Sequence, residues 1–173
     1  MSDDAIPVWE GRFVTAWRRG RWEYVSRARD IHAAVILAID DGHVLLVEQY
    51  RVPLAARSLE LPAGLVGDEE ADEAIEVAAT RELEEETGYR PARIELLGRF
   101  APSPGLTSET FTLVRASGLA KVGDGGGVPG EDIAVLRVPV GEVPAFVAAK
   151  RDEGVMIDVK LLILLAADIL REA

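Results

Sequence analysis

One stretch of the chain, Ala71 to Thr87, contains neither proline nor glycine and is rich in alanine, glutamate and leucine. This composition favours an α-helix, and the glycine that follows, Gly88, is typical of a helix end. At about 100° per residue, Glu82, Glu85 and Glu86 fall within one arc of the helix. Carboxylates this close repel one another, but they are the oxygen ligands that Mg²⁺ prefers. The pattern indicates either a solvated acidic face or a divalent-cation site.

A longer pattern surrounds this acidic arc and favours the cation site. Gly67 is followed after five residues by Glu73, and after seven more by the run RELEEETGY at residues 81–89. This spacing resembles the signature of the Nudix hydrolases at every defining position. The resemblance implies an α/β fold, a Nudix-type α/β/α sandwich with a mixed sheet. It also implies hydrolysis of a nucleoside diphosphate linked to another group, with Mg²⁺, or alternatively Mn²⁺, as the cofactor.

The resemblance also assigns roles around the helix. The metal ligands it implies are Glu82, Glu85 and Glu86, with the backbone carbonyl of Ala63 as an additional ligand. Arg81 stands next to Glu82 and four residues before Glu85. It can therefore pair with a metal-binding carboxylate and hold it in place, so Arg81 and Glu82 also belong to the catalytic set.

Two further features concern the start of the helix. Glu73 lies where the helix begins, and a carboxylate there is favoured by the exposed N–H groups, so we expect a capping role. In most members of the family that this sequence resembles, the signature glycine directly follows Pro-Ala, as Gly64 does, but Gly64 lies seventeen residues before Arg81 and Gly67 meets the spacing instead. The resemblance therefore implies three residues inserted between the Pro-Ala-Gly turn and the helix. We expect the insertion to lengthen the loop before the helix and to leave the carboxylate face intact.

A glutamate on a loop downstream of the signature activates the water in the ADP-ribose branch of this family. Its counterpart here is Glu131, and Asp132 is the second candidate. Both end the segment from Lys121 to Asp132, which is too glycine-rich for regular structure and is expected to be a mobile loop. Such a loop can close over bound substrate and exclude water.

Three short segments outside the signature resemble the ADP-ribose pyrophosphatase subfamily: Gln49–Pro53, Glu60–Gly64 and Ser103–Gly105. The resemblance implies that Arg51 meets a phosphate with its forked donors, that Glu60 also contacts substrate, and that Ser103 and Gly105 face the terminal ribose. The products would be AMP and ribose 5-phosphate. Hydrolysis of another nucleoside diphosphate sugar, such as GDP-mannose, is the close alternative. A non-catalytic nucleotide-binding regulator is the more distant one.

Residues 8–26 alternate apolar and polar side chains about a turn near Arg19-Gly20, which predicts a protruding N-terminal β-hairpin. We assign residues 1–30 to this arm and residues 31–173 to the hydrolase domain. The three tryptophans of the chain lie in the arm and can pack beneath it. In the subfamily the arm is exchanged between two subunits, which implies a homodimer. Arg21, Trp22 and Glu23 would then grip the adenine, by stacking and by accepting a hydrogen bond.

The remaining elements are predicted from hydrophobic patterning. Strands are expected at 31–39 and 44–50, joined by an Asp-Gly turn, and at 93–100, 110–115 and 133–138, with a short extended piece at 60–65. Helices are expected at 141–150 and 155–170, the second packing against the sheet.

The composition and net charge of the chain restrict the classes of binding partner that we expect. A net charge of −11 argues against nucleic acid, because phosphate backbones need clustered Lys and Arg. A small phosphate substrate is compatible with this charge if a metal bridges the two anions. The absence of cysteine excludes disulfides and zinc–thiolate sites, and the longest apolar run, 161–167, is too short to span a membrane. The start of the chain lacks the features of a signal peptide, so we expect no membrane partner and a cytoplasmic location. The partner we expect is a small-molecule nucleoside diphosphate substrate.

Overall fold

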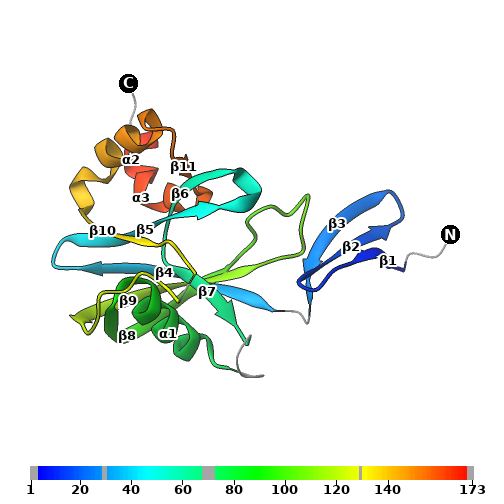
Figure 1. Ribbon diagram of the computed structural model, residues 1–173, viewed down its shortest axis with the longest axis horizontal. Helices are drawn as coiled ribbons and strands as arrows, with labels where there is room; N and C mark the ends of the chain where they lie inside the picture. Colours follow the sequence, from blue (N-terminus) through cyan, green and yellow to red (C-terminus); the bar gives the residue numbers. More distant parts are fainter. Residues whose placement is uncertain (1–3, 29–30, 68–72, 129, 171–173) are drawn as a thin grey trace.

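The computed structural model describes residues 4–28, 31–67, 73–128 and 130–170 of the 173-residue chain (Figure 1). The strands are β1 (Ile6–Glu10), β2 (Val14–Arg19), β3 (Trp22–Arg27), β4 (His32–Asp40), β5 (His43–Arg51), β6 (Ala56–Glu60), β7 (Ala63–Val66), β8 (Tyr89–Phe100), β9 (Phe111–Lys121), β10 (Ala134–Pro139) and β11 (Met156–Ile157). The α-helices are α1 (Ile75–Thr87), α2 (Val143–Asp152) and α3 (Leu162–Ile169), and short 3₁₀ turns lie at Val52–Leu54, Val140–Glu142 and Val159–Leu161.

The main sheet is mixed. Its strands run in the order β11-β6-β5-β4-β9-β8, with β10 paired to β5 and β7 paired to β4. The β4–β9 and β11–β6 pairs are parallel, and the other pairs of this sheet are antiparallel. The predicted strands at 31–39 and 44–50 are confirmed as β4 and β5, joined at Asp41-Gly42.

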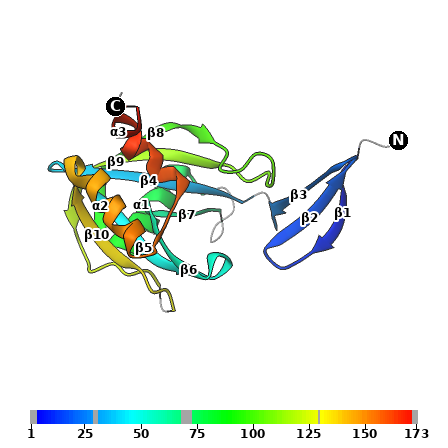
Figure 2. The same ribbon diagram turned by 90° about the horizontal axis from the view of Figure 1, so that it is seen from above.

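Alternation along β4 divides the core into two layers. Ala34, Ile36 and Ala38 point to the face covered by α1, where Ala78, Ala79 and Leu83 pack on them. Val35 and Leu37 point to the opposite face, together with residues of α2 and of the α3 region: Val143, Val147, Leu161 and Leu165. Helices therefore cover both faces of the sheet (Figures 1 and 2), which confirms the predicted α/β/α sandwich.

Helix α1 ends where the sequence predicts and begins later. Gly88 adopts a left-handed conformation (φ 74°), and its N–H donates to the carbonyl of Glu84 at 2.8 Å. The first helical residue is Ile75, and the predicted first turn at residues 71–72 lies outside the described residues. Ala74 precedes the helix without a side-chain cap, so the predicted capping role of Glu73 is wrong.

The C-terminal segment departs from the prediction of a single helix over 155–170. Met156 and Ile157 pair with β6 as a parallel strand instead, and a 3₁₀ turn and α3 follow. The helix starts late because the side chain of Asp158 accepts the backbone N–H of Lys160 at 2.7 Å and so begins the 3₁₀ turn. The helix predicted at 141–150 is confirmed as α2, shifted by two residues.

The N-terminal arm is a three-stranded antiparallel sheet, β1-β2-β3, that protrudes from the sandwich (Figures 1 and 2). The predicted hairpin turn is confirmed between β2 and β3, and β1 is an additional strand on β2. Val25 joins the arm to the loop before β9 through backbone hydrogen bonds with Leu106 and Ser108. Of the three tryptophans, Trp17 is half-buried and donates to Ser26, whereas Trp9 and Trp22 are each 58% exposed.

Among the described residues, no helix is long and apolar enough to cross a membrane.

Candidate active site

The acidic arc of α1 lies against the backbone of Ala63 and Gly64. The N–H of Ala63 donates to Glu86 Oε2 at 3.0 Å, and the Glu86 side chain is buried. Gly64 is in closer contact still, because a Cβ added there would stand 1.8 Å from Cδ of Glu82. Only glycine leaves room for that carboxylate. The Pro-Ala-Gly turn is therefore packed onto the carboxylate face.

Arg81 links several acidic side chains and a backbone carbonyl around the start of this face. Its Nη1 lies 2.9 Å from Glu82 Oε1 and 3.5 Å from Glu85 Oε2, while its Nε lies 3.3 Å from Glu73 Oε1. Nη2 also donates to the carbonyl oxygen of Leu65. Burial alone would lower the pKa of Arg81, but Glu73 and Glu82 hold it above its ordinary value. The predicted pairing of Arg81 with carboxylates of the arc is present, and Glu73 belongs to the same cluster rather than to a helix cap.

The environment of Glu86 is crowded with negative charge. Burial raises the pKa of Glu86 to about 8, and the charges of Glu82 and Glu131 act in the same direction, against the N–H of Ala63 and the charge of Arg51. A divalent cation relieves this kind of crowding, since it compensates several carboxylates at once.

The donor set fits Mg²⁺ or Mn²⁺ by its chemistry, because Glu82, Glu85 and Glu86 offer only oxygen ligands. Within the described ranges, no group of three or more such side chains is already arranged to hold a metal ion. The ion pairs of Glu82 and Glu85 with Arg81 give a physical reason for this. The carbonyl of Ala63 belongs to the same turn whose N–H contacts Glu86.

The glycine-rich segment lies on the C-terminal end of α1. The N–H groups of Gly126 and Gly127 donate to the carbonyls of Glu86 and Glu85 at 2.9 and 3.0 Å. The segment is irregular, as predicted, and these bonds fix its described part to the helix. Further along, Glu131 accepts the N–H of Val128 at 3.1 Å and lies close enough to influence Glu86 electrostatically. Asp132 instead pairs with Arg57 at 2.8 Å. Pro129, part of the predicted catalytic loop, lies outside the described residues.

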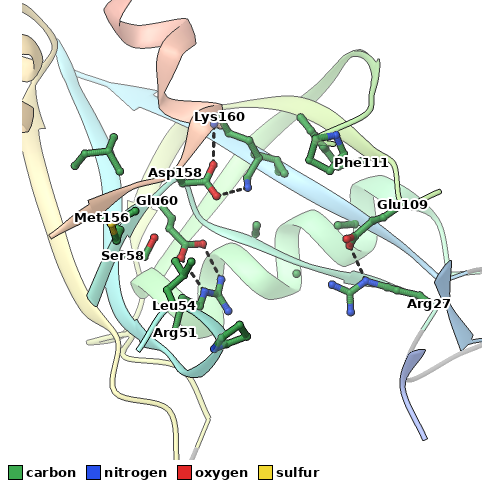
Figure 3. Close-up of a pocket in the computed structure, with 17 residues that line it drawn as sticks. Arg27, Arg51, Leu54, Ser58, Glu60, Glu109, Phe111, Met156, Asp158 and Lys160 are labelled. Carbon is green, nitrogen blue, oxygen red and sulfur yellow. Dashed lines mark hydrogen bonds and ion pairs between the residues drawn. The ribbon is translucent and has the colours of Figure 1, made fainter. Parts of the chain in front are cut away.

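A pocket of ≈ 530 Å³ opens beside this centre, and Ala63 and Gly64 form part of its lining. Two residues predicted to bind substrate meet in it (Figure 3). Arg51 donates to both carboxylate oxygens of the buried Glu60, each at 2.7 Å. The hydrogen bonds to Glu60 hold the pKa of Arg51 above its ordinary value. Two of the three guanidinium nitrogens of Arg51 thus serve to fix its position.

Other walls of the pocket were not foreseen from the sequence. Phe111 and the ion pair between Lys160 and Asp158 (2.5 Å) lie on one side, and the ion pair between Arg27 and Glu109 (2.6 Å) lies on another (Figure 3). Asp158 and Lys160 were missed because their segment reads as helix. The signal that could have revealed Asp158 is an Asp immediately before the apolar run that starts at Val159, which is a typical helix N-cap.

The remaining predicted substrate residues lie elsewhere in the chain. Trp22 and Gly105 line a second cavity of ≈ 410 Å³ between the arm and the loop before β9. Arg21 and Glu23 are exposed on the arm, and the carbonyl of Ser103 accepts the N–H groups of Leu106 and Thr107 in a turn. Within one chain, these residues therefore do not share the pocket that holds Arg51 and Glu60.

A mixed sheet between helices, with an acidic helix face beside a pocket, defines an α/β/α sandwich of the Nudix type. A crystal structure described as an ADP compounds hydrolase has the same fold, with a TM-score of 0.70 at 22% identity over 96% of this chain and 91% of that one. The model of the NUDIX domain matches residues 28–158. The chain belongs to this family.

Three proteins illustrate the relatives to which this sequence is similar. A methanol dehydrogenase activator of Bacillus methanolicus is 37% identical over 68% of this chain, and an ADP-ribose pyrophosphatase of Bacillus subtilis is 38% identical over 50%. The chain spans 63% and 45% of the length of these two relatives. A GDP-mannose pyrophosphatase of Cronobacter sakazakii is 32% identical over 83% of this chain and 78% of that protein.

Proposed function

We propose that this protein hydrolyses the pyrophosphate bond of ADP-ribose to AMP and ribose 5-phosphate, in a reaction that depends on Mg²⁺ or Mn²⁺. One observation carries the proposal. Ala63 and Gly64 line the pocket and at the same time pack against Glu86 and Glu82 of α1. A pyrophosphate that reached this end of the pocket would lie next to the carboxylate face, while the groups on either side of it extended away.

Each residue of the centre has a role in this reaction. Glu82, Glu85 and Glu86, with the carbonyl of Ala63, would hold the metal, which would supply positive charge to neutralise the phosphates and to make the attacking water more acidic. Arg81 holds Glu82 and Glu85 in position. Arg51, fixed by Glu60, lies near enough for its charge to act on Glu86 and would bind a phosphate oxygen.

The chemical step breaks one phosphorus–oxygen bond of the pyrophosphate and forms another to the oxygen of water. The proton of the attacking water passes to Glu131, and the departing phosphate carries the electron pair of the broken bond. Glu131 suits this role because it lies on the loop that packs on the end of α1, and its charge reaches Glu86.

ADP-ribose is favoured as substrate by the segments around Arg51, Glu60 and Ser103 and by the similarity to the Bacillus subtilis pyrophosphatase. GDP-mannose is the second candidate. It is favoured by the similarity to the Cronobacter sakazakii protein, which extends over 83% of this chain.

A panel of nucleoside diphosphate sugars assayed with Mg²⁺ tests the proposal. ADP-ribose should give the highest kcat/KM, with AMP and ribose 5-phosphate as products. A higher kcat/KM for GDP-mannose would transfer the substrate assignment to the second candidate. Binding of nucleotides without turnover of any member of the panel would contradict the enzyme and support a non-catalytic regulator.

The arm supports a further part of the proposal, a homodimer in which residues 1–30 dock on a second copy. Its described part exposes the large apolar side chains of Ile6, Val8, Trp9, Phe13, Val14 and Trp22. Docking would cover them and bring Arg21, Trp22 and Glu23 toward the adenine of the other subunit's substrate.

A double variant, Val8→Glu combined with Phe13→Glu, tests this role. It should sediment as a monomer and show a raised KM, whereas the control Val77→Glu, on the exposed face of α1, should stay dimeric. A double variant that stays dimeric with an unchanged KM would refute the arm's role.

The cytoplasmic location and the lack of a nucleic-acid partner stay predictions.

A further inference from the structure

A second charged cluster lies on the sheet outside the carboxylate face. Glu48 of β5 is buried, and both of its carboxylate oxygens are held. Arg57 Nε donates to one at 2.7 Å and Lys150 Nζ of α2 lies 2.9 Å from the other. Arg57 Nη2 also donates to the backbone carbonyl of Glu48 at 3.0 Å. Burial would raise the pKa of Glu48, but the hydrogen bonds from Lys150 and Arg57 outweigh it and hold the pKa below its ordinary value. This cluster anchors the guanidinium of Arg57 firmly.

The remaining terminal nitrogen of Arg57 connects this anchor to the loop of the proposed base. Nη1 donates to Asp132 Oδ2 at 2.8 Å, across 75 residues of sequence. An exposed ion pair contributes little when both side chains must be ordered to form it. Here Arg57 is already fixed by Glu48, so Asp132, whose side chain is 83% exposed, is the partner that becomes ordered.

The described part of the loop between β9 and β10 is thus held at several places, starting with Val122 and Gly123, whose N–H groups donate to the carbonyl of Gly88. Gly126 and Gly127 bond to the end of α1, and Ala134 enters the sheet opposite Glu48. The bond of Asp132 to Arg57 lies between these two attachments, one residue from Glu131. Glu131 itself is exposed, and its carboxylate has a local partner in the N–H of Val128. The position of Glu131 relative to α1 therefore depends on where its neighbour Asp132 is held.

We propose that Arg57 is a positioning residue: anchored by Glu48 and Lys150, it holds Asp132 and thereby sets the position of the Glu131 carboxylate opposite Glu86. The inference rests on the proposed function, in which Glu131 accepts a proton from the attacking water. Arg57 itself touches neither water nor phosphate in this scheme, so its effect must pass through the loop.

Two variants test this from either side of the contact. Arg57→Met removes the anchor, and Asp132→Asn weakens the contact while leaving the bonds between Arg57 and Glu48 in place. Both should lower kcat about 10- to 100-fold with little change in KM, because misplacement of a catalytic group by a fraction of an ångström is costly. Arg137→Met is the matched control, since this arginine lies on β10, which like β6 pairs with β5, and forms an ion pair with Asp41 at the surface. It should keep the wild-type kcat.

Hydrogen exchange of the amides of residues 130–133, in protein without metal or substrate, gives a readout independent of activity. Exchange should be several-fold faster in Arg57→Met and Asp132→Asn and unchanged in Arg137→Met. Unchanged exchange in both Arg57→Met and Asp132→Asn would overturn the inference. Faster exchange with a wild-type kcat would also overturn it, provided that Glu131→Gln lowers kcat.

Combination with Glu131→Gln separates this inference from the proposed function. If Arg57 acts through Glu131, Arg57→Met should cause no further loss of kcat in the Glu131→Gln background. A full additional loss there would overturn the inference. A wild-type kcat for Glu131→Gln alone would instead remove Glu131 as the base, and the exchange result would then decide by itself whether Arg57 holds the loop.

Discussion

The carboxylate face of α1 and the pocket beside it share the Ala63-Gly64 turn but are built in different ways. The face comes from one continuous helix, and two of its acids, Glu82 and Glu85, are held by Arg81 from the same helix. The pocket comes from β3, β4, β5, β6, β7, β9 and the segment around β11, and its charged walls are three ion pairs: Arg27–Glu109, Arg51–Glu60 and Lys160–Asp158. The acids of the face carry a surplus of negative charge, whereas those pocket pairs are each neutral.

This difference indicates a division of labour. A buried surplus of negative charge suits cation binding and chemistry, because a metal relieves it. Neutral, fixed ion pairs around an apolar wall such as Phe111 suit recognition, because they present oriented hydrogen-bonding groups without a net charge to repel a substrate. Variants of the face should therefore change kcat, and variants of the pocket should change KM.

The largest effect is expected on the face. Glu86→Gln should lower kcat by about 100-fold or more, since a metal contributes several kcal/mol of transition-state stabilisation. Glu84→Gln is the matched control on the same helix, because Glu84 points away and pairs with Arg90 at 2.8 Å. Steady-state rates on ADP-ribose compare the two. Equal rates would refute the assignment of the acidic arc.

A smaller effect is expected at the shared turn. In Gly64→Ala the new Cβ would collide with Glu82, so the carboxylate must move, and kcat should fall about tenfold or more with a stability loss of about 1–3 kcal/mol. Gly141→Ala is the control, because a Cβ there meets no atom within 4 Å. Kinetics and urea unfolding measure both effects. Full activity in Gly64→Ala would show that Glu82 need not stay where it is.

The pocket variant should change affinity rather than rate. Glu60→Gln removes the charge that fixes Arg51, so KM should rise about tenfold with kcat within a factor of a few. Glu95→Gln breaks the exposed ion pair with Arg115 and should leave both constants unchanged. Saturation kinetics of both variants measure KM and kcat separately. A Glu60→Gln enzyme with normal KM and low kcat would reverse the assignment of the pocket to recognition.

The smallest effect concerns acid stability at the cluster that anchors Arg57. The folded-state pKa of Glu48 is lowered, so its stabilising contribution is present above its unfolded pKa of about 4.3 and is lost as pH falls through the folded value. Glu48→Gln should therefore lower Tm at pH 7, and the difference from wild type should narrow below about pH 4. A difference that stayed constant down to pH 3 would contradict the lowered pKa.

The sequence predicts the carboxylate face of α1 much better than it predicts the pocket. The helix, its glycine end and the arc of three glutamates follow from local spacing, and so does the pairing of Arg81. The pocket does not, because Phe111, Asp158 and Lys160 come together only through the β4–β9 and β11–β6 pairings. Glu73 was misassigned because a local helix-start effect was expected, whereas the tertiary contact with Arg81 prevails. The Glu48–Arg57–Asp132 contacts depend on sheet register and have no local signal.

The central claim is that the face and the pocket act on one substrate molecule, and a crystal structure of Glu86→Gln with ADP-ribose and Mg²⁺ tests it most directly. The pyrophosphate should lie at Ala63-Gly64, beside Arg51 and the side chain at position 86, with one end of the substrate in the pocket against Phe111. A ligand bound only in the cavity between Trp22 and Gly105, with its pyrophosphate away from α1, would contradict the account.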